Sequence, residues 1–158
     1  MYSTPVAEYD GRPLHELRET LIVKEAIRRT MQGNRGKESK PEIALRCALW
    51  KVGLRGYRKN VKKLPGKPDI VFGRAELAIF VHGCFWHGCT KCKRRYRTPK
   101  TNPRYWTAKI EGNQVRDERN RVLLVEMGYD VLVFWECEIK GDGLNAAVEK
   151  VRVTLAGR

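Results

Sequence analysis

The sequence predicts one layered α/β domain, in which a central mixed sheet is flanked by helices. The chain has 158 residues, which is the usual length of a single domain with its own hydrophobic core. Segments with helical patterns alternate with short apolar segments, in the order helix, strands, helix, strand, helix. That order is typical of helices packed on the faces of a sheet.

The amino-terminal part of the chain is predicted to be an extension of this domain. Residues 1 to about 15 look irregular, and "ELRETLIVKEAIRRTM" has the composition of a helix that "QGNRGKESK" ends. We therefore divide the chain into residues 1–30, an extension or clamping arm, and residues 31–158, the domain.

A helix is predicted to begin at "SKPE", because Ser39 is a good cap and a proline and an acid follow in the first turn. It is predicted to end at Gly53. The single Cys47 is interpreted as a buried core thiol, since small cysteines are often buried. The expected apolar face consists of Ile43, Leu45, Leu49, Trp50 and Val52.

The remaining elements follow from apolar patterning. Residues 69–72 and 77–81 are predicted to be neighbouring strands joined by the turn-like "GRAE". Residues 105–127 alternate apolar and charged side chains up to Gly128, which indicates a long helix with a polar face. "DVLVFWE" predicts a buried strand, and "LNAAVEKVRVTLAG" a final helix.

Charge and composition narrow the class of protein. The 32 Lys and Arg residues outnumber the 18 Asp and Glu residues and give a formal charge of +14, which indicates an anionic partner, with nucleic acid as the first expectation. No segment reaches the roughly 20 apolar residues of a membrane span, and residues 1–10 lack a signal-peptide core. We expect a soluble, cytoplasmic protein without a membrane partner.

Three of the five cysteines lie close together in "VHGCFWHGCTKC", a spacing that favours metal ligation over a disulfide. Structural zinc has four tetrahedral ligands. Cys84, Cys89 and Cys92 supply three. Cys137 ends the strand 131–136 and can supply the fourth if that strand lies beside 77–81. His87 is the competing ligand, and packing of the thiols without a metal is the alternative.

The same region carries candidate catalytic groups. Asp69 opens a strand and lies where a carboxylate could bind Mg²⁺ beside the end of the next strand. His82 and His87 flank Cys-Phe-Trp, and a neutral imidazole can accept a proton from water near pH 7. Asp117 is the expected carboxylate partner, with an ion pair to Arg116 or Arg121 as the alternative.

Four motifs together resemble one family. "LPGKPDIVF", "FVHGCFWHGC", "TPKTNPRYWTAKIEGNQVRD" and "VLVFWECEI" occur in the order and spacing typical of very short patch repair (Vsr) endonucleases, which nick one strand of mismatched DNA. The resemblance covers about residues 31–139. It implies a restriction-endonuclease-like, three-layer fold with a structural zinc site.

The resemblance also implies roles for individual residues. Asp69 and the main-chain carbonyl of Val81 resemble the family's ligands to a catalytic Mg²⁺. His87, with Asp117, resembles its general base, and His82 its second catalytic histidine. Glu42 matches an acid near the metal centre.

The family's zinc ligands match Cys84, Cys92 and Cys137, and Cys89 stands where relatives can have histidine. Phe85, Trp86 and Trp106 resemble aromatic residues that the family inserts between base pairs, which costs least at a mismatch. Met31 resembles a minor-groove residue.

The basic run "KCKRRYRTPK" is predicted to contact DNA phosphates, with a solvated basic face as the alternative. The predicted contacts are Lys91, Lys93, Arg94, Arg95, Arg97 and Lys100.

The function expected from these residues is strand-specific nicking of duplex DNA at T:G mismatches. The expected cofactors are Mg²⁺ in catalysis and Zn²⁺ in structure. The expected partners are mismatched double-stranded DNA and other mismatch-repair proteins, and the protein is expected to be a monomer. Two alternatives remain, a nuclease of the same fold without mismatch selectivity and a zinc-stabilised DNA-binding module without catalysis.

Overall fold

The computed structural model describes residues 38–91 and 102–158. Three α-helices lie in these residues, namely α3 (Lys40–Lys51), α4 (Pro103–Glu126) and α5 (Gly143–Ala156). The strands are β1 (Arg58–Lys59), β2 (Ile70–Phe72), β3 (Leu77–His82) and β4 (Asp130–Trp135). Two 3-10 helices, η1 (Gly73–Ala75) and η2 (Glu136–Ile139), follow β2 and β4. The helix expected in residues 16–31 lies outside the described residues.

The four strands form one mixed sheet in the order β1-β2-β3-β4. β2 pairs antiparallel with both β1 and β3, whereas β3 and β4 are parallel. The predicted neighbours 69–72 and 77–81 are therefore confirmed as a hairpin. The condition set for Cys137, that strand 131–136 lies beside strand 77–81, is met, with His82 opposite Trp135.

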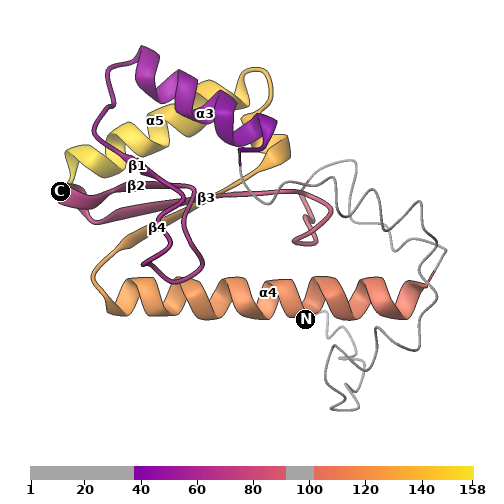
Figure 1. Ribbon diagram of the computed structural model, residues 1–158. Helices are drawn as coiled ribbons and strands as arrows, with labels where there is room; N and C mark the ends of the chain where they lie inside the picture. Colours follow the sequence, from indigo (N-terminus) through magenta and orange to yellow (C-terminus); the bar gives the residue numbers. More distant parts are fainter. Residues whose placement is uncertain (1–37, 92–101) are drawn as a thin grey trace, which may run out of the picture.

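The sheet lies between two layers of helices (Figure 1). α3 and α5 cover one face, and the long helix α4 crosses the other. This confirms the predicted α/β class and its mixed sheet. The main core lies between the sheet and the α3–α5 layer, and it consists of Leu45, Leu49, Ile70, Phe72, Leu77, Ile79, Phe134, Ile139, Ala147, Val148 and Val151.

The start of α3 is built as predicted. Ser39 is the N-cap, its hydroxyl accepts a hydrogen bond from the Glu42 N–H, and the Glu42 carboxylate accepts one from the Ser39 N–H, which completes a capping box. Gly53 follows the helix with φ +81°, a value that glycine adopts without strain.

The predicted apolar face of α3 is only partly correct. Leu45 and Leu49 are buried, but Ile43, Trp50 and Val52 are exposed. Cys47 is exposed too, so its interpretation as a buried core thiol is wrong. It lies two residues from both Leu45 and Leu49, which is about 200° around a helix, and therefore points away from the core.

In the long helix α4, as in α3, the apolar side chains on one face are buried and those on other faces are exposed. Trp106 and Ile110 are buried, whereas Val115 is 71% exposed and Val122 and Val125 are also exposed. With about 100° per residue, residues 106, 110, 113, 117 and 124 share one face, and Val115 lies opposite. That face packs toward the sheet.

β4 is less buried than predicted, since Phe134 is its one fully buried residue. In the described sheet it is an edge strand, with β3 as its only neighbour. In residues 38–91 and 102–158, no helix combines the length and apolarity that a membrane span requires.

Candidate active site and cysteine cluster

Asp69 lies immediately before β2, beside the last part of β3. Its carboxylate Oδ2 accepts a hydrogen bond of 2.7 Å from the main-chain N–H of Val81, and its own N–H donates to the carbonyl of Ile79 at 3.0 Å. The pKa of Asp69 is raised to about 6, chiefly by burial and also by the nearby Glu42 carboxylate, against the opposing effect of the Val81 N–H. The structure therefore holds a partly buried carboxyl group next to Val81, the other residue predicted to bind Mg²⁺.

The two predicted histidines meet at the end of β3. The rings of His82 and His87 stack with centroids 4.1 Å apart and an interplanar angle of 13°. Nδ1 of His87 hydrogen-bonds Oδ2 of Asp117 on α4. Burial and then the neighbouring His87 lower the pKa of His82 to about 4, so that His82 is neutral at pH 7.

Asp117 therefore lies against His87 and not in the alternative ion pairs. The Arg116 guanidinium donates to the Asn113 side chain at 2.8 Å, and Arg121 pairs with Glu118 at 2.6 Å.

Two further residues of α4 hold the loop between β3 and the cysteine cluster. Asn113, which is buried, donates to the carbonyl of Trp86 at 2.6 Å. Gln114 donates to the carbonyl of His87 at 3.1 Å. The sequence interpretation missed both residues. The signal was the helix face, because Asn113 lies with Asp117 on the stripe that begins at Trp106 and Ile110.

Gly88 permits this close approach between loop and helix. Its φ is +68°, and a Cβ atom there would lie 2.5 Å from Nε2 of Gln114. A larger residue would strain the backbone and would displace the Gln114 side chain, which donates to the carbonyl of His87.

The cysteines gather at the ends of the parallel pair β3 and β4. Cys84, Cys89 and Cys137 place their sulfur atoms within 4.8 Å of one another, and Sγ of Cys89 lies 3.8 Å from Sγ of Cys137. The register of β3 with β4 explains this, since it brings the loop after His82 next to the residues after Trp135. Cys92 lies outside the described residues.

His87 belongs to a different group from these cysteines. His82, His87 and Asp117 form a second cluster whose potential ligand atoms lie within 4.8 Å of one another. Cys89, and not the competing His87, lies with Cys84 and Cys137.

The predicted DNA-inserting aromatics form one cluster. The ring of Phe85 lies 5.2 Å from those of both Trp86 and Trp106, and Trp86 lies 5.9 Å from Trp106. Phe85 and Trp86 are half-buried, whereas Trp106 is 6% exposed. Met31 lies outside the described residues.

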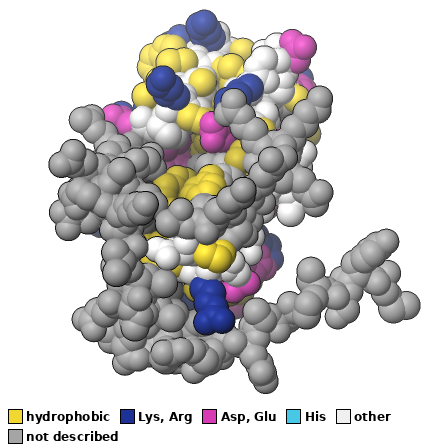
Figure 2. Space-filling view, turned by 90° about the vertical axis from the view of Figure 1, so that its right-hand side faces the viewer, with side chains coloured by type: hydrophobic (Ala, Val, Ile, Leu, Met, Phe, Trp, Pro, Cys, Tyr) yellow, Lys and Arg dark blue, Asp and Glu magenta, His cyan; other side chains and the backbone are white. Residues whose placement is uncertain are grey.

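Figure 2 shows the end of the molecule that faces right in Figure 1. Hydrophobic side chains gather in the middle of this face, with Lys and Arg side chains nearer its two ends.

Glu42 and Lys91 are both engaged with other groups. Glu42 is 5% exposed, and its two oxygens accept hydrogen bonds from the main-chain N–H groups of Glu38 and Ser39. Lys91 pairs with Glu138 at 2.8 Å, and this contact raises the pKa of the lysine. The other basic residues predicted to contact DNA, Lys93, Arg94, Arg95, Arg97 and Lys100, lie outside the described residues.

Known proteins resemble this chain along most of its length. The model of the family described as "DNA mismatch endonuclease Vsr" matches residues 21–94. The type II nicking enzyme V.XorIIP of Xanthomonas oryzae pv. oryzae is 45% identical over 119 residues, which cover 75% of this chain and 85% of that protein. The type II nicking enzyme V.NmeAIP of Neisseria meningitidis is 41% identical over 121 residues, or 73% and 84% of the two chains.

The DNA mismatch endonuclease Vsr of Escherichia coli K12 is 40% identical over 85 residues, which cover 54% of this chain and 53% of that protein. The family model and the extent of these matches confirm the resemblance seen in the sequence motifs. The chain therefore belongs to the Vsr family and is a DNA endonuclease.

Proposed function

We propose that this endonuclease nicks one strand of duplex DNA at a T:G mismatch. The proposal depends mainly on one observation, that a single loop, residues 83–89, carries the candidate catalytic and recognition groups together. It holds the paired base His87, two half-buried aromatic rings and two cysteines, and α4 anchors it through Asn113, Gln114 and Asp117. The aromatic rings that recognise the mismatch and the base that cleaves the strand would therefore be held at a fixed distance from each other.

In the proposed mechanism His87 is the general base. With Nδ1 bound to Asp117, the Nε2 atom is the one available to take a proton from the attacking water, and Asp117 stabilises the charged imidazole. The water oxygen forms a bond to phosphorus as the bond to the 3′ oxygen breaks. The products carry a 5′ phosphate and a 3′ hydroxyl, whose proton comes from solvent.

His82 would assist as a neutral ring. Because its pKa is lowered to about 4, it can donate a hydrogen bond to the phosphate but does not bring a positive charge at pH 7. Its stacking on His87 also restrains the orientation of the base.

Asp69 and the carbonyl of Val81 are the proposed Mg²⁺ ligands. The fit rests on Asp69, since a hard cation prefers such a carboxylate, and a raised carboxyl pKa in a partly buried setting is typical of functional groups. Bound Mg²⁺ would stabilise the negative charge that develops on the phosphate. We propose that Glu42 contributes to the metal site only indirectly and does not bind Mg²⁺, because its two oxygens already accept hydrogen bonds at the start of α3.

The cysteine cluster suits a structural zinc ion. Tetrahedral zinc with bonds of about 2.3 Å separates its sulfur ligands by about 3.8 Å, and Cys89 and Cys137 show that separation, 3.8 Å. We propose Cys84, Cys89 and Cys137 as three ligands and Cys92 as the fourth. The ion would fix the loop that carries the base and the aromatic rings.

Phe85 and Trp86 are the proposed wedge, with Trp106 packed against both rings. Their insertion would cost several kcal/mol of unstacking in matched DNA and less at a mismatch, where stacking and pairing are already weaker. The insertion of Trp106 and Met31 remains a prediction.

We propose a restriction-endonuclease-like fold. Two observations support it, namely the three layers of the molecule and the position of Asp69 between β2, the end of β3 and α3. We also propose that the protein acts in the cytoplasm as a monomer, together with other mismatch-repair proteins.

One alternative function has an observation in its favour. Two of the similar proteins are named as type II nicking enzymes, and those names do not mention mismatches. A nickase without mismatch selectivity would use the same catalytic groups. A zinc-stabilised DNA-binding module without catalysis does not fit a member of an endonuclease family.

The proposal is tested by comparing two end-labelled duplexes that differ in one pair, T:G or T:A. With Mg²⁺ we expect a nick in one strand of the T:G duplex and at least about tenfold slower cutting of the T:A duplex, a difference of about 1.4 kcal/mol. Without Mg²⁺ neither duplex should be cut. Equal cutting of both duplexes would support the non-selective nickase instead.

A further inference from the structure

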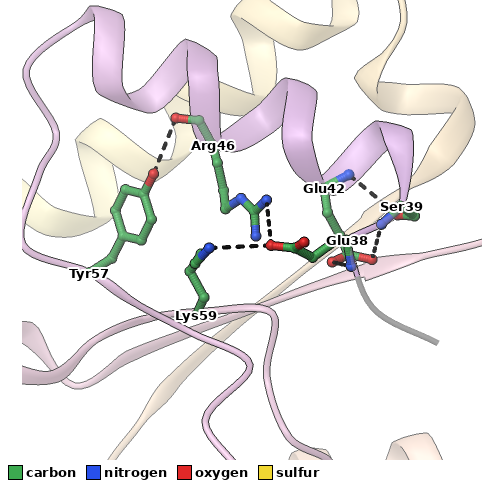
Figure 3. A network of polar contacts seen from close by, with 6 residues as sticks. All are labelled: Glu38, Ser39, Glu42, Arg46, Tyr57 and Lys59. Carbon is green, nitrogen blue, oxygen red and sulfur yellow. Dashed lines mark hydrogen bonds and ion pairs between the residues drawn. The ribbon is translucent and has the colours of Figure 1, made fainter. Parts of the chain in front are cut away.

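A groove lies between α3 and the edge strand β1, away from the cysteine cluster. It has a volume of about 380 Å³. Its lining combines cations with aromatic rings, and it consists of Arg46, Cys47, Trp50, Lys51, Tyr57 and Lys59. Figure 3 shows its Arg46 and Lys59 side chains directed toward the same point, the carboxylate of Glu38.

Arg46 has more donors than acceptors in this groove. Its side chain is 11% exposed, and Nη2 lies 3.4 Å from Oε1 of Glu38. Nη1 is buried and meets no hydrogen-bond acceptor among the described residues. Leaving a buried charged donor unpaired is costly. An anion in the place of Glu38 would meet Arg46 through Nη2, the nitrogen that Glu38 contacts, since guanidinium groups bind carboxylates and phosphates alike.

Lys59 shares the acceptor of Arg46. Its Nζ lies 3.2 Å from Oε1 of Glu38, and Lys59 and Glu38 are both about half exposed. One carboxylate oxygen therefore faces two cations, and the group as a whole keeps one positive charge. Because Glu38 is exposed, an incoming anion can replace it at the small cost of a solvent-screened surface ion pair.

The group lies beside Asp69. Lys59 is paired with Ile70 across the sheet, and the N–H of Asn60 donates to the carbonyl of Asp69 at 3.1 Å. The charge of Arg46 also acts on the Asp69 carboxyl group and lowers its pKa, against the larger effect of burial. Lys91, which pairs with Glu138 of η2, lies by the segment that follows the other edge strand, β4.

We propose that Arg46 and Lys59 form a binding site for a DNA backbone phosphate, and that the Glu38 carboxylate occupies this site in the free protein. Phosphate would replace the Glu38 carboxylate as the acceptor that Arg46 and Lys59 share, and would release Glu38 to solvent. Such a contact adds affinity and fixes the register of the duplex without reading its sequence. The proposal rests on endonuclease activity and not on mismatch selectivity.

The first test removes one cation. Lys59→Gln is compared with Arg74→Gln, which removes an exposed cation from the turn between β2 and β3, at the far end of β2 from Asp69. Binding to a matched duplex is measured without Mg²⁺ over a range of salt concentrations. Lys59→Gln should weaken binding about fivefold or more and reduce the slope of log K against log salt by about one. Equal effects of the two variants would overturn the proposal.

The second test removes the competing acid. Glu38→Gln should tighten binding about two- to fivefold, the equivalent of an exposed ion pair. Glu149→Gln is its control, since it makes the same change of charge in an exposed pair with Arg152 on α5. Equal tightening in both variants would show a general charge effect and would contradict the displacement of Glu38.

A modified duplex then locates the contact. Phosphates are replaced one at a time by neutral methylphosphonates in a duplex that footprinting shows to be bound in one register, and the penalty of Lys59→Gln should disappear for one position only. A penalty that persists at every position would overturn the proposal. These measurements use binding alone, so they are independent of whether the enzyme prefers a T:G pair.

Discussion

At the scale of single residues, the proposed site is made of groups that are costly to bury. Asp69 is held between β2 and β3 with a pKa of about 6, far above the ordinary value of 3.8, chiefly because burial disfavours its charge. A folded-state pKa above the unfolded value means that the native protein binds the proton more tightly. The carboxyl group therefore destabilises the metal-free fold increasingly as the pH rises from about 4 to about 6.

The variant Asp69→Asn should therefore separate stability from activity. Asparagine can still accept the Val81 hydrogen bond but carries no charge, so at pH 8 without Mg²⁺ the variant should be more stable by on the order of 2 kcal/mol. Thermal melts at pH 8 and pH 4 measure the difference, which should shrink at pH 4. Nicking should be lost. A variant that melts below the wild type at pH 8 would contradict this assignment.

Residue roles were predictable only where several motifs coincided. The pairing of Asp117 with His87 was expected from the spacing of the motifs and the family resemblance. Cys47 was misassigned because apolar neighbours in sequence do not share a face in a helix. Asn113 was missed although it lies on the helix face of Trp106 and Asp117, because its role became visible only with its acceptor, the carbonyl of Trp86.

At the scale of elements, the parallel pairing of β3 with β4 builds the cysteine cluster. From the sequence this pairing was only the condition under which Cys137 could join the other cysteines, because two apolar strands can occupy any positions in a sheet. β1 was not predicted, because a two-residue strand of Arg58 and Lys59 has no apolar pattern and exists only through its pairing with β2. The groove beside Arg46 could not be predicted either, because β1 forms one of its sides.

Zinc in this cluster should stabilise both the fold and the active loop. Cys137→Ser should lower the bound zinc, measured by atomic emission, and lower Tm by several degrees, because the ligand joins β4 to the loop after β3. Cys47→Ser, which changes an exposed cysteine on α3, is the matched control and should leave both quantities unchanged. Undiminished zinc and Tm in Cys137→Ser would exclude Cys137 as a ligand.

At the scale of the whole molecule, helices on both faces bring distant segments to one end of the sheet. α3 contributes Glu42 and Arg46, β2 and β3 contribute Asp69 and His82, and α4 anchors the loop from the opposite layer (Figure 1). The layered class followed from the order of elements. Their exact contacts did not, because the burial of each helix face depends on the partner it packs against.

The central claim is that one loop joins mismatch recognition to cleavage. The most direct measurement is the ratio of single-turnover nicking rates on T:G and T:A duplexes for the wild type, Phe85→Ala and Met127→Ala, which truncates an exposed side chain at the end of α4. We predict a ratio well above one for the wild type and Met127→Ala. For Phe85→Ala it should fall about tenfold or more, by loss of T:G cutting. An unchanged ratio in Phe85→Ala would contradict the account.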